Sequence, residues 1–380
     1  MVSKRVARLL FLFIFVSGLV EAVVSPVPAP PKQPAKSYLL IDFNSDSVLA
    51  EKNIDQQIEP ASITKLMTAY VVYKELDAGR LSLDESVTVS EKAWRMGGSK
   101  MFIEVGKKVR LGDLLKGLVI QSGNDAAVAL AEHIAGSEST FADYMNQYAQ
   151  SLGMTKTNFV NSTGWPHRNH RTTARDIAAL GKAIIKEFPH HYALYSEKKF
   201  TFNGIPQYNR NKLLWRDKTV DGMKTGHTES AGYCLISSAK RDDMRLIAVV
   251  LGTRSEKARA DVSQSLLSYG FRFYESNRLY AAGEGLNQTR IWKGENENLS
   301  LGLKDDLHVT IPRGQYKYLD AVMDVNKDII APVAKGQQLG TVKVMFDGEE
   351  ILSRPLVALQ SVAEGSIWQR TKDQIIQLFR

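Results

Sequence analysis

Three short polar motifs, far apart along the chain, constrain its fold most strongly, because they can act together only if the fold brings them to one place. They are a Ser-x-x-Lys motif at Ser62–Lys65, a Ser-x-Asn motif at Ser122–Asn124 and a Lys-Thr-Gly motif at Lys224–Gly226. Ser-x-x-Lys alone is a weak signal, since it recurs at Ser196–Lys199 and Ser237–Lys240, whereas the other two motifs each occur once. The ordered combination, rather than any single motif, carries the functional hypothesis.

The first motif is suited to nucleophilic catalysis by serine. Ser-x-x-Lys on a helix puts both side chains on one face, one turn apart. A serine hydroxyl is a poor nucleophile until a neighbouring base takes its proton, and Lys65 can do so only when it is neutral. Its pKa must then fall from ~10.4 toward ~7, through desolvation and a second cation, which we take to be Lys224. We expect Ser62 as the nucleophile and Lys65 as its base; the alternative is a helix cap beside a surface lysine.

The second and third motifs supply the groups that such a serine enzyme needs around it. Ser122 can pass a proton to a leaving amine, and Asn124 can hydrogen-bond a substrate amide; an ordinary turn with an N-cap is the alternative for both. Lys224 and Thr225 can hold a carboxylate, while Gly226 leaves room for a substrate backbone beside the strand that we expect around Tyr233. Together the motifs predict the opening of an amide bond next to a carboxylate.

Three further residues are candidates for the same site. His227 directly follows the third motif and can tune it, although a solvated loop histidine is an equal alternative. Arg210 and Arg259 can add positive charge near a substrate carboxylate, with exposed surface arginines as the alternative for each.

The N-terminus predicts export. Lys4, Arg5 and Arg8 precede an apolar run, Leu9–Val20, and small residues suited to cleavage follow, which is the layout of a secretory signal peptide over residues 1–22. The alternative is an uncleaved anchor, but the run is shorter than the ~20 apolar residues that span a bilayer. We therefore expect a protein of the bacterial periplasm or cell surface.

The net charge and the cysteine content limit which partners and disulfides are expected. Removing residues 1–22 takes away three basic residues and one acidic residue, so the net charge of +8 falls to about +6. Nucleic acid is disfavoured as a partner, because the chain is exported and its basic residues are spread out. Cys234 is the only cysteine, so no disulfide forms within the chain, and we interpret it as a buried small hydrophobic residue.

Changes in composition and in the pattern of apolar residues divide the chain into five parts. Residues 23–36 hold five prolines and predict an extended linker. Residues 37–284 mix a helical block with strands near both ends, which predicts an α+β catalytic domain. Residues 285–362 alternate short strands with turns and predict a small all-β sandwich. Residues 363–380 predict a C-terminal amphipathic helix. The principal expected elements are strands at 37–41, 48–50, 199–202, 232–239 and 246–251, and helices at 62–76, 111–117, 125–135, 145–152, 172–186 and 257–274.

The C-terminal helix has two interpretations. It can pack on its own β domain, or its apolar side can lie on a membrane, assisted by Arg370, Lys372 and Arg380. We favour the membrane, with Glu364-Gly365 as a hinge. One such helix binds weakly, so pairing of two chains in a homodimer would strengthen attachment by avidity.

With these motifs the chain resembles the low-molecular-mass penicillin-binding proteins, specifically the D-alanyl-D-alanine carboxypeptidases of the penicillin-binding protein 5 and 6 type. The order of the three motifs matches the combination known for this class of enzyme and for class A β-lactamases. The resemblance also extends to segments outside the motifs. These are Pro60-Ala61-Ser62, Gln121 to Asp125, Asn209-Arg210-Asn211, Val220-Asp221-Gly222, Gly226-His227-Thr228, Gly270 to Phe273 and Thr310 to Gly314. One local departure is the region of His167 and His170.

The resemblance implies a transpeptidase-like domain, a β domain and a membrane-anchoring helix, on the periplasmic face of the inner membrane. It implies that Ser62 is acylated, that Lys65 is its base, that Ser122 and Asn124 are the second-motif partners and that Lys224 contacts the substrate carboxylate. The implied reaction removes the terminal D-alanine from peptidoglycan pentapeptide stems through an acyl-enzyme. β-Lactams would acylate the same serine, and no metal or organic cofactor is implied.

Three other functions remain open. A β-lactamase of class A uses a glutamate for deacylation, and no suitable Glu-x-x-x-Asn segment lies between Asn124 and Lys224. A peptidoglycan endopeptidase attacks a similar D-alanyl bond and is harder to separate from a carboxypeptidase. A non-catalytic wall-binding protein would not require a nucleophile paired with a base.

Overall fold

The computed structural model describes residues 27–378. The predicted signal peptide, residues 1–22, and the start of the predicted linker lie outside this part of the chain. Within the described residues, no helix combines the length and the apolar composition needed to cross a bilayer.

A five-stranded antiparallel sheet, in the order β2-β1-β9-β8-β7, forms the centre of the first domain. Its central strand β9 carries the apolar run 246–251, which is fully buried, so both faces of the sheet must be covered. β7 lies at an edge of this sheet, and among residues 27–378 no strand pairs with its outer side. The strands are β1 (Ser37–Asp42), β2 (Val48–Lys52), β7 (Val220–Thr228), β8 (Gly232–Arg241) and β9 (Met244–Thr253).

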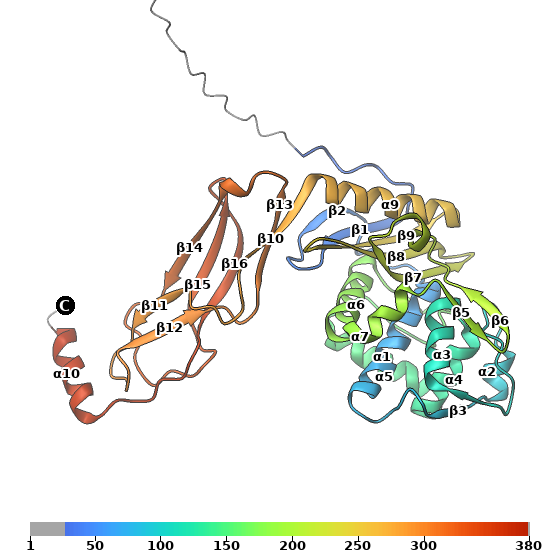
Figure 1. The fold of residues 1–380 in the computed structure, drawn as a ribbon, viewed down its shortest axis with the longest axis horizontal. Coiled ribbons are helices and arrows are strands. Elements are labelled where there is room, and N and C mark those ends of the chain that lie inside the picture. The colour runs from blue at the N-terminus through green and yellow to red at the C-terminus, as the bar shows by residue number, and fades with distance from the viewer. Residues whose placement is uncertain (1–26, 379–380) are drawn as a thin grey trace, which may run out of the picture.

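Helices cover the two faces of this sheet unequally. A single long helix, α9 (Glu256–Phe273), packs on one face, and a cluster of helices covers the other, as Figure 1 shows. Each face has its own apolar core. The clustered helices are α1 (Lys65–Asp77), α2 (Glu91–Arg95), α3 (Leu111–Lys116), α4 (Asn124–Ala135), α5 (Glu138–Ser151), α6 (Ala174–Glu187) and α7 (Pro189–Tyr192). The short helix α8 (Leu213–Arg216) lies on the α9 side, where its leucines join the same core and Arg216 pairs with Asp261 of α9. A two-stranded antiparallel sheet of β3 (Ser86–Thr88) and β4 (Lys108–Arg110) and a hairpin of β5 (Lys199–Phe202) and β6 (Ile205–Tyr208) also belong to this domain.

The predicted helix from Ser62 to Leu76 is corrected by the structure. Residues Ala61–Thr64 form a 3-10 turn, and α1 begins only at Lys65. Because a 3-10 helix has three residues per turn, residues i and i+3 still lie above one another. Ser62 and Lys65 therefore keep the shared face that the motif requires.

The second domain is all-β. It has a five-stranded sheet, β11-β12-β16-β15-β14, and a two-stranded sheet, β10-β13, around one shared core. β10, which lies before the boundary predicted at residue 284, pairs with β13 of this domain. The strands are β10 (Tyr274–Tyr280), β11 (Asn287–Arg290), β12 (Asn298–Gly302), β13 (Leu307–Pro312), β14 (Leu319–Val325), β15 (Gln338–Phe346) and β16 (Glu349–Ala358). The predicted α+β fold followed by a β domain is confirmed.

The C-terminal helix α10 (Ile367–Leu378) lies on the far side of the β domain from the first domain (Figure 1). Its polar Asp373 faces the β domain: this buried carboxylate accepts from the Lys293 backbone N–H at 2.6 Å and from the Arg290 guanidinium at 3.2 Å. Trp368 is 85% exposed. The helix is thus fastened by its polar side, which argues against a free hinge at Gly365.

Candidate active site

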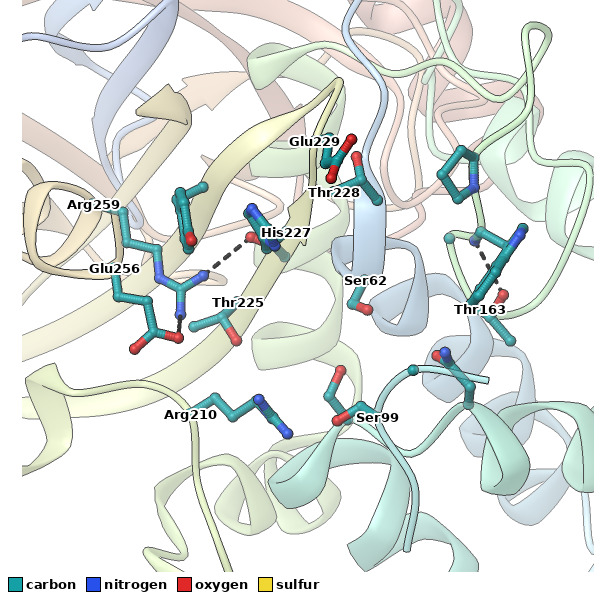
Figure 2. Close-up of a pocket in the computed structure, with 18 residues that line it drawn as sticks. Ser62, Ser99, Thr163, Arg210, Thr225, His227, Thr228, Glu229, Glu256 and Arg259 are labelled. Carbon is teal, nitrogen blue, oxygen red and sulfur yellow. Dashed lines mark hydrogen bonds and ion pairs between the residues drawn. The ribbon is translucent and has the colours of Figure 1, made fainter. Parts of the chain in front are cut away.

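The three motifs converge on one open cleft of about 760 Å³. Ser62, Ser122, Asn124, Thr225 and Gly226 all line it, although they come from a 3-10 turn, the loop before α4, the first residue of α4 and the edge strand β7. Figure 2 shows Ser62 at the centre, with Thr225, Arg210 and Arg259 on one side and Thr163 on the opposite side. The predicted proximity of the motifs is therefore present in the fold.

Tight backbone packing fixes the turn that carries Ser62. A Cβ atom at Gly226 would lie 3.0 Å from the Pro60 carbonyl oxygen and 3.2 Å from the Ile63 nitrogen. Gly164 has φ +85°, and a Cβ there would lie only 1.8 Å from the Ala61 carbonyl oxygen. Both glycines are required because the turn lies directly against them. Gly226 thus has a structural reason in addition to the predicted space for a substrate.

Lys65 is held in a geometry suited to a general base. Its buried Nζ lies 2.6 Å from Asn124 Oδ1, 2.7 Å from the Thr163 carbonyl oxygen and 3.1 Å from Ser62 Oγ. The first two partners only accept hydrogen bonds. A neutral amine would donate its two hydrogens to them and aim its lone pair at the Ser62 hydroxyl.

Burial makes the neutral form accessible. Desolvation lowers the pKa of Lys65 from 10.5 to about 7; Asp125 opposes this shift and Arg210 adds to it. The low pKa that the sequence analysis requires of Lys65 therefore results mainly from burial rather than from a second cation.

Lys224 faces Ser122 rather than the open cleft. Its buried Nζ donates to Ser122 Oγ at 2.8 Å and to the Thr225 carbonyl oxygen at 3.1 Å. Burial, followed by the charges of Lys65, Arg210 and Arg259, lowers its pKa well below the ordinary value. Ser122 has φ 65°, a left-handed conformation that costs a non-glycine residue ~1–2 kcal/mol. This conformation ends the π-helical turn Gly117–Gln121 and orients the hydroxyl.

The Asn124 side chain links the second motif to the first. Its Oδ1 accepts from Lys65, and its Nδ2 donates to the Gly97 carbonyl oxygen at 2.8 Å, so one N–H of the amide group is left for a ligand. A Cβ at Gly98 would lie 2.9 Å from Asn124 Nδ2. The close approach of this loop therefore positions the amide.

Sequence reasoning missed two supports of the site. Asp125 is buried and accepts from the backbone N–H groups of Met101, Phe102 and Ile103, which fixes the loop opposite β7. Its place directly after the second motif was a usable signal. The Thr163 carbonyl that binds Lys65 is a backbone group, and no side-chain pattern in the sequence marks it.

The two candidate arginines differ from each other. Arg210 is exposed, donates to the Gln121 carbonyl oxygen at 3.1 Å and lines the cleft. Arg259 is buried, so the alternative of a surface arginine is wrong for it. It donates to the Gly226 carbonyl oxygen at 3.1 Å, lies over the Tyr233 ring and pairs with Glu256 at 3.5 Å. Together they make this side of the cleft cationic.

The histidines take different positions. His227 is exposed in the cleft and stacks on Tyr233 with ring centroids 3.9 Å apart. His170 is buried, and its Nε2 lies 2.9 Å from Thr64 Oγ1, next to Lys65. Burial lowers the pKa of His170 to about 4, so a neutral ring supports the turn.

The positions of the other two Ser-x-x-Lys serines and of Cys234, all outside the cleft, agree with the choice of Ser62 as the candidate nucleophile. Ser237 of the third Ser-x-x-Lys pattern lies inside β8 and is buried, and Ser196 lies in a short 3-10 turn. Cys234 is fully buried, and burial raises the pKa of its thiol to about 11, which confirms the expected small hydrophobic residue.

Known proteins match nearly the whole chain. The family model described as D-alanyl-D-alanine carboxypeptidase matches residues 25–255, and that of the penicillin-binding protein 5 C-terminal domain matches residues 274–364. D-alanyl-D-alanine carboxypeptidase DacC of Escherichia coli K12 is 43% identical over 97% of this chain and 94% of its own length. DacA of the same strain is 42% identical over 93% of this chain and 90% of its own length. The solved structure of penicillin binding protein 5 from Haemophilus influenzae superposes with a TM-score of 0.86 at 42% identity, covering 89% of this chain and all of that one.

Proposed function

The chain belongs to the D-alanyl-D-alanine carboxypeptidase family and is a serine-type enzyme of that class, and we propose that Ser62, Lys65 and Ser122 carry its chemistry. Its substrate is the D-alanyl-D-alanine end of a peptidoglycan pentapeptide stem, from which it releases the terminal D-alanine. β-Lactams react with the same serine. The observation that carries this proposal is the lone-pair geometry of Lys65, 3.1 Å from Ser62 Oγ.

The acylation step follows from this geometry. Lys65 Nζ takes the Ser62 proton as Oγ attacks the carbonyl carbon of the penultimate D-alanine. The C–N bond to the terminal D-alanine then breaks, and the leaving nitrogen takes a proton from the Ser122 hydroxyl. Lys224, 2.8 Å from Ser122 Oγ, is placed to replace that proton. The products of this step are free D-alanine and an ester at Ser62.

The cationic side of the cleft suits the terminal carboxylate. We propose that Thr225 and Arg210 contact it, with Arg259 and the buried Lys224 behind them and His227 beside them. The free N–H of Asn124 and the open edge of β7 at Gly226 then hold the peptide backbone. Before the second half of the reaction, Lys65 gives up the proton that it took from Ser62 and Lys224 regains one, so the net transfer is from Ser62 to the leaving nitrogen. Water then hydrolyses the ester: neutral Lys65 accepts a proton from the water and passes it to Ser62 Oγ as the ester bond breaks.

We also propose export and attachment to the periplasmic face of the bacterial inner membrane. The predicted signal peptide supports export. On α10, Ile367, Trp368 and Leu378 are 74%, 85% and 78% exposed, while Asp373 faces the β domain. Exposed apolar side chains opposite a polar fastening fit an interfacial helix. Pairing of two chains as a homodimer remains a prediction.

Release of D-alanine from diacetyl-L-lysyl-D-alanyl-D-alanine tests the function. The full chain should release it, and the Ser62→Ala variant should not. A cross-linked muropeptide dimer distinguishes the alternative function. Cleavage of the dimer without release from the tripeptide would favour an endopeptidase, and rapid hydrolysis of a trapped penicillin would favour a β-lactamase.

A further inference from the structure

A second hollow, of about 840 Å³, opens beyond the C-terminal end of β7. It shares His227, Glu229 and Tyr233 with the active-site cleft, and its other walls come from the chain before β1, the end of β2 and the end of β9. Figure 2 shows Thr228 and Glu229 at the end of β7 that is remote from Arg210. The second hollow therefore continues the cleft on the side away from Arg210.

Three basic side chains line this hollow, and all three are exposed: Lys36, Lys52 and Arg254. The Lys36 ammonium donates to the Ser230 carbonyl oxygen at 3.4 Å, and the Lys52 ammonium donates to the Ala35 carbonyl oxygen at 2.8 Å. The Arg254 guanidinium makes no hydrogen bond or ion pair with any other residue between 27 and 378. Within this part of the chain, none of the three cations pairs with a carboxylate, so all three are available to an anion.

Backbone packing fixes two of these cations in place. Gly252 has φ +73°, and a Cβ there would lie 2.6 Å from Lys36 Cδ and 2.7 Å from Cγ, so the aliphatic part of this lysine lies directly on the glycine. The Lys36 backbone N–H donates to the Leu251 carbonyl oxygen at 3.0 Å. Arg254 follows two residues after Gly252, in the short link between β9 and α9. Among the described residues that line the hollow, Glu229 is the one acidic residue, so the lining keeps a net positive charge.

The proposed function determines which part of the substrate reaches this hollow. With the terminal carboxylate at Thr225 and Arg210, the stem runs antiparallel to β7. Three extended stem residues span ~10 Å, which equals the three-residue distance along β7 from Thr225 to Thr228. The residue three places before the terminal D-alanine therefore lies where the second hollow begins. In a pentapeptide stem this is a D-glutamyl residue linked through its side-chain carboxyl, which leaves its α-carboxylate free.

We propose that Lys36, Lys52 and Arg254 form an anion site for this D-glutamyl α-carboxylate. The inference rests on the proposed function and specifies a second acidic group that the substrate carries. Ammonium and guanidinium groups form charge-assisted hydrogen bonds with a carboxylate. Because the three cations are exposed, each contributes modestly and salt weakens the attraction.

Two pentapeptides that differ in one functional group test this site in the full chain. One is L-alanyl-γ-D-glutamyl-L-lysyl-D-alanyl-D-alanine, and the other carries D-isoglutamine, in which an amide replaces the α-carboxylate. Release of D-alanine gives kcat/KM for each peptide. For the wild type we expect the acid to exceed the amide about fivefold, as for a few exposed ion pairs. High salt should bring this ratio toward one.

The variants assign the ratio to the cations. Arg254→Gln should lower it to about two, and the double variant Lys36→Gln/Arg254→Gln should lower it to about one. Arg254→Lys should keep most of the wild-type ratio, because it keeps the charge. Lys107→Gln is the matched control and should leave the ratio unchanged, because it removes an exposed charge that lines neither hollow nor cleft. The amide peptide should be cleaved equally by all these proteins.

Equal kcat/KM for the two peptides in the wild type would overturn the anion site and leave the proposed function in place. A double variant that keeps the fivefold ratio would overturn it as well. If Arg254→Gln slowed both peptides equally, the arginine would have a structural effect, and its role in the site would be wrong. Absence of D-alanine release from both peptides would instead refute the proposed function itself.

Discussion

Replacing Lys65 by arginine puts a permanent positive charge next to Ser62 and removes the proposed base. At pH 7 a lysine with a pKa of about 7 is half neutral, whereas an unperturbed lysine with a pKa of 10.5 is neutral in only ~1 of 3,000 molecules. The shift of Lys65 therefore increases base availability by ~10³, equivalent to ~5 kcal/mol at 1.36 kcal/mol per pKa unit. Because arginine stays protonated above pH 12, Lys65→Arg should acylate at least ~10³-fold more slowly.

Stopped-flow acylation by a fluorescent penicillin measures this loss directly. In the wild type the acylation rate should fall about tenfold per pH unit below pH ~7, where Lys65 becomes protonated. Lys74→Arg is the matched control, because Lys74 lies on the same helix and pairs with Glu187 outside the cleft. Its acylation rate should equal that of the wild type, and circular dichroism should show both variants folded. Acylation of Lys65→Arg within tenfold of the wild type, or a wild-type rate that stays constant down to pH 5, would refute the assignment of Lys65 as the base.

Three further predictions test other parts of the structure. Gly226→Ala should slow acylation at least tenfold in a folded protein, since the added Cβ would meet the Pro60 carbonyl at 3.0 Å and displace the Ser62 turn at a cost of ~1–3 kcal/mol; an unchanged stopped-flow rate would contradict this. Between pH 7 and 10.5 the unfolded chain binds a proton at Lys65 that the native chain does not, so wild-type stability should rise with pH by ~1.4 kcal/mol per unit more than that of Lys65→Met. Urea unfolding at pH 7.5 and 9.5 measures this difference, and equal slopes would contradict the buried, neutral lysine. Trp368→Ser should weaken binding to anionic vesicles at least tenfold, because a side chain of this size contributes ~2 kcal/mol when buried. Trp94→Ser, an exposed tryptophan of the first domain, should not weaken it, and equal loss in both variants would argue against α10 as the anchor.

Much of the fold can be predicted from the sequence, because the residues that determine a helix or a strand lie close together along the chain. The buried run of β9 and the helical spacing of α4, α6 and α9 are visible in the sequence because each element is long and its apolar residues are periodic. β7 was not predicted, since Lys224-Thr225-Gly226 and the second glycine, Gly222, give it a low strand propensity. It is a strand because β8 pairs with it along its length.

The candidate site also contains features that the sequence predicts and features that it does not. The side chains that we propose carry the chemistry, Ser62, Lys65 and Ser122, could be selected from motif spacing alone. Their supports could not, because they act through the backbone or through tertiary packing. The Thr163 carbonyl on Lys65 is one example, and the close approach of Gly164 to Ala61 is another. Arg259 was also beyond sequence reasoning, since its burial depends on the packing of α9 against the sheet.

The proposed mechanism is tested most directly by finding which residue carries the acyl group during turnover. The full chain is mixed with diacetyl-L-lysyl-D-alanyl-D-alanine, quenched in acid within milliseconds, digested and examined by mass spectrometry. If Ser62 is the nucleophile, a diacetyl-lysyl-D-alanyl ester should be found on the peptide that contains Ser62, formed together with free D-alanine and absent from Ser62→Ala. An ester on any other residue, or D-alanine release that persists in Ser62→Ala, would contradict it.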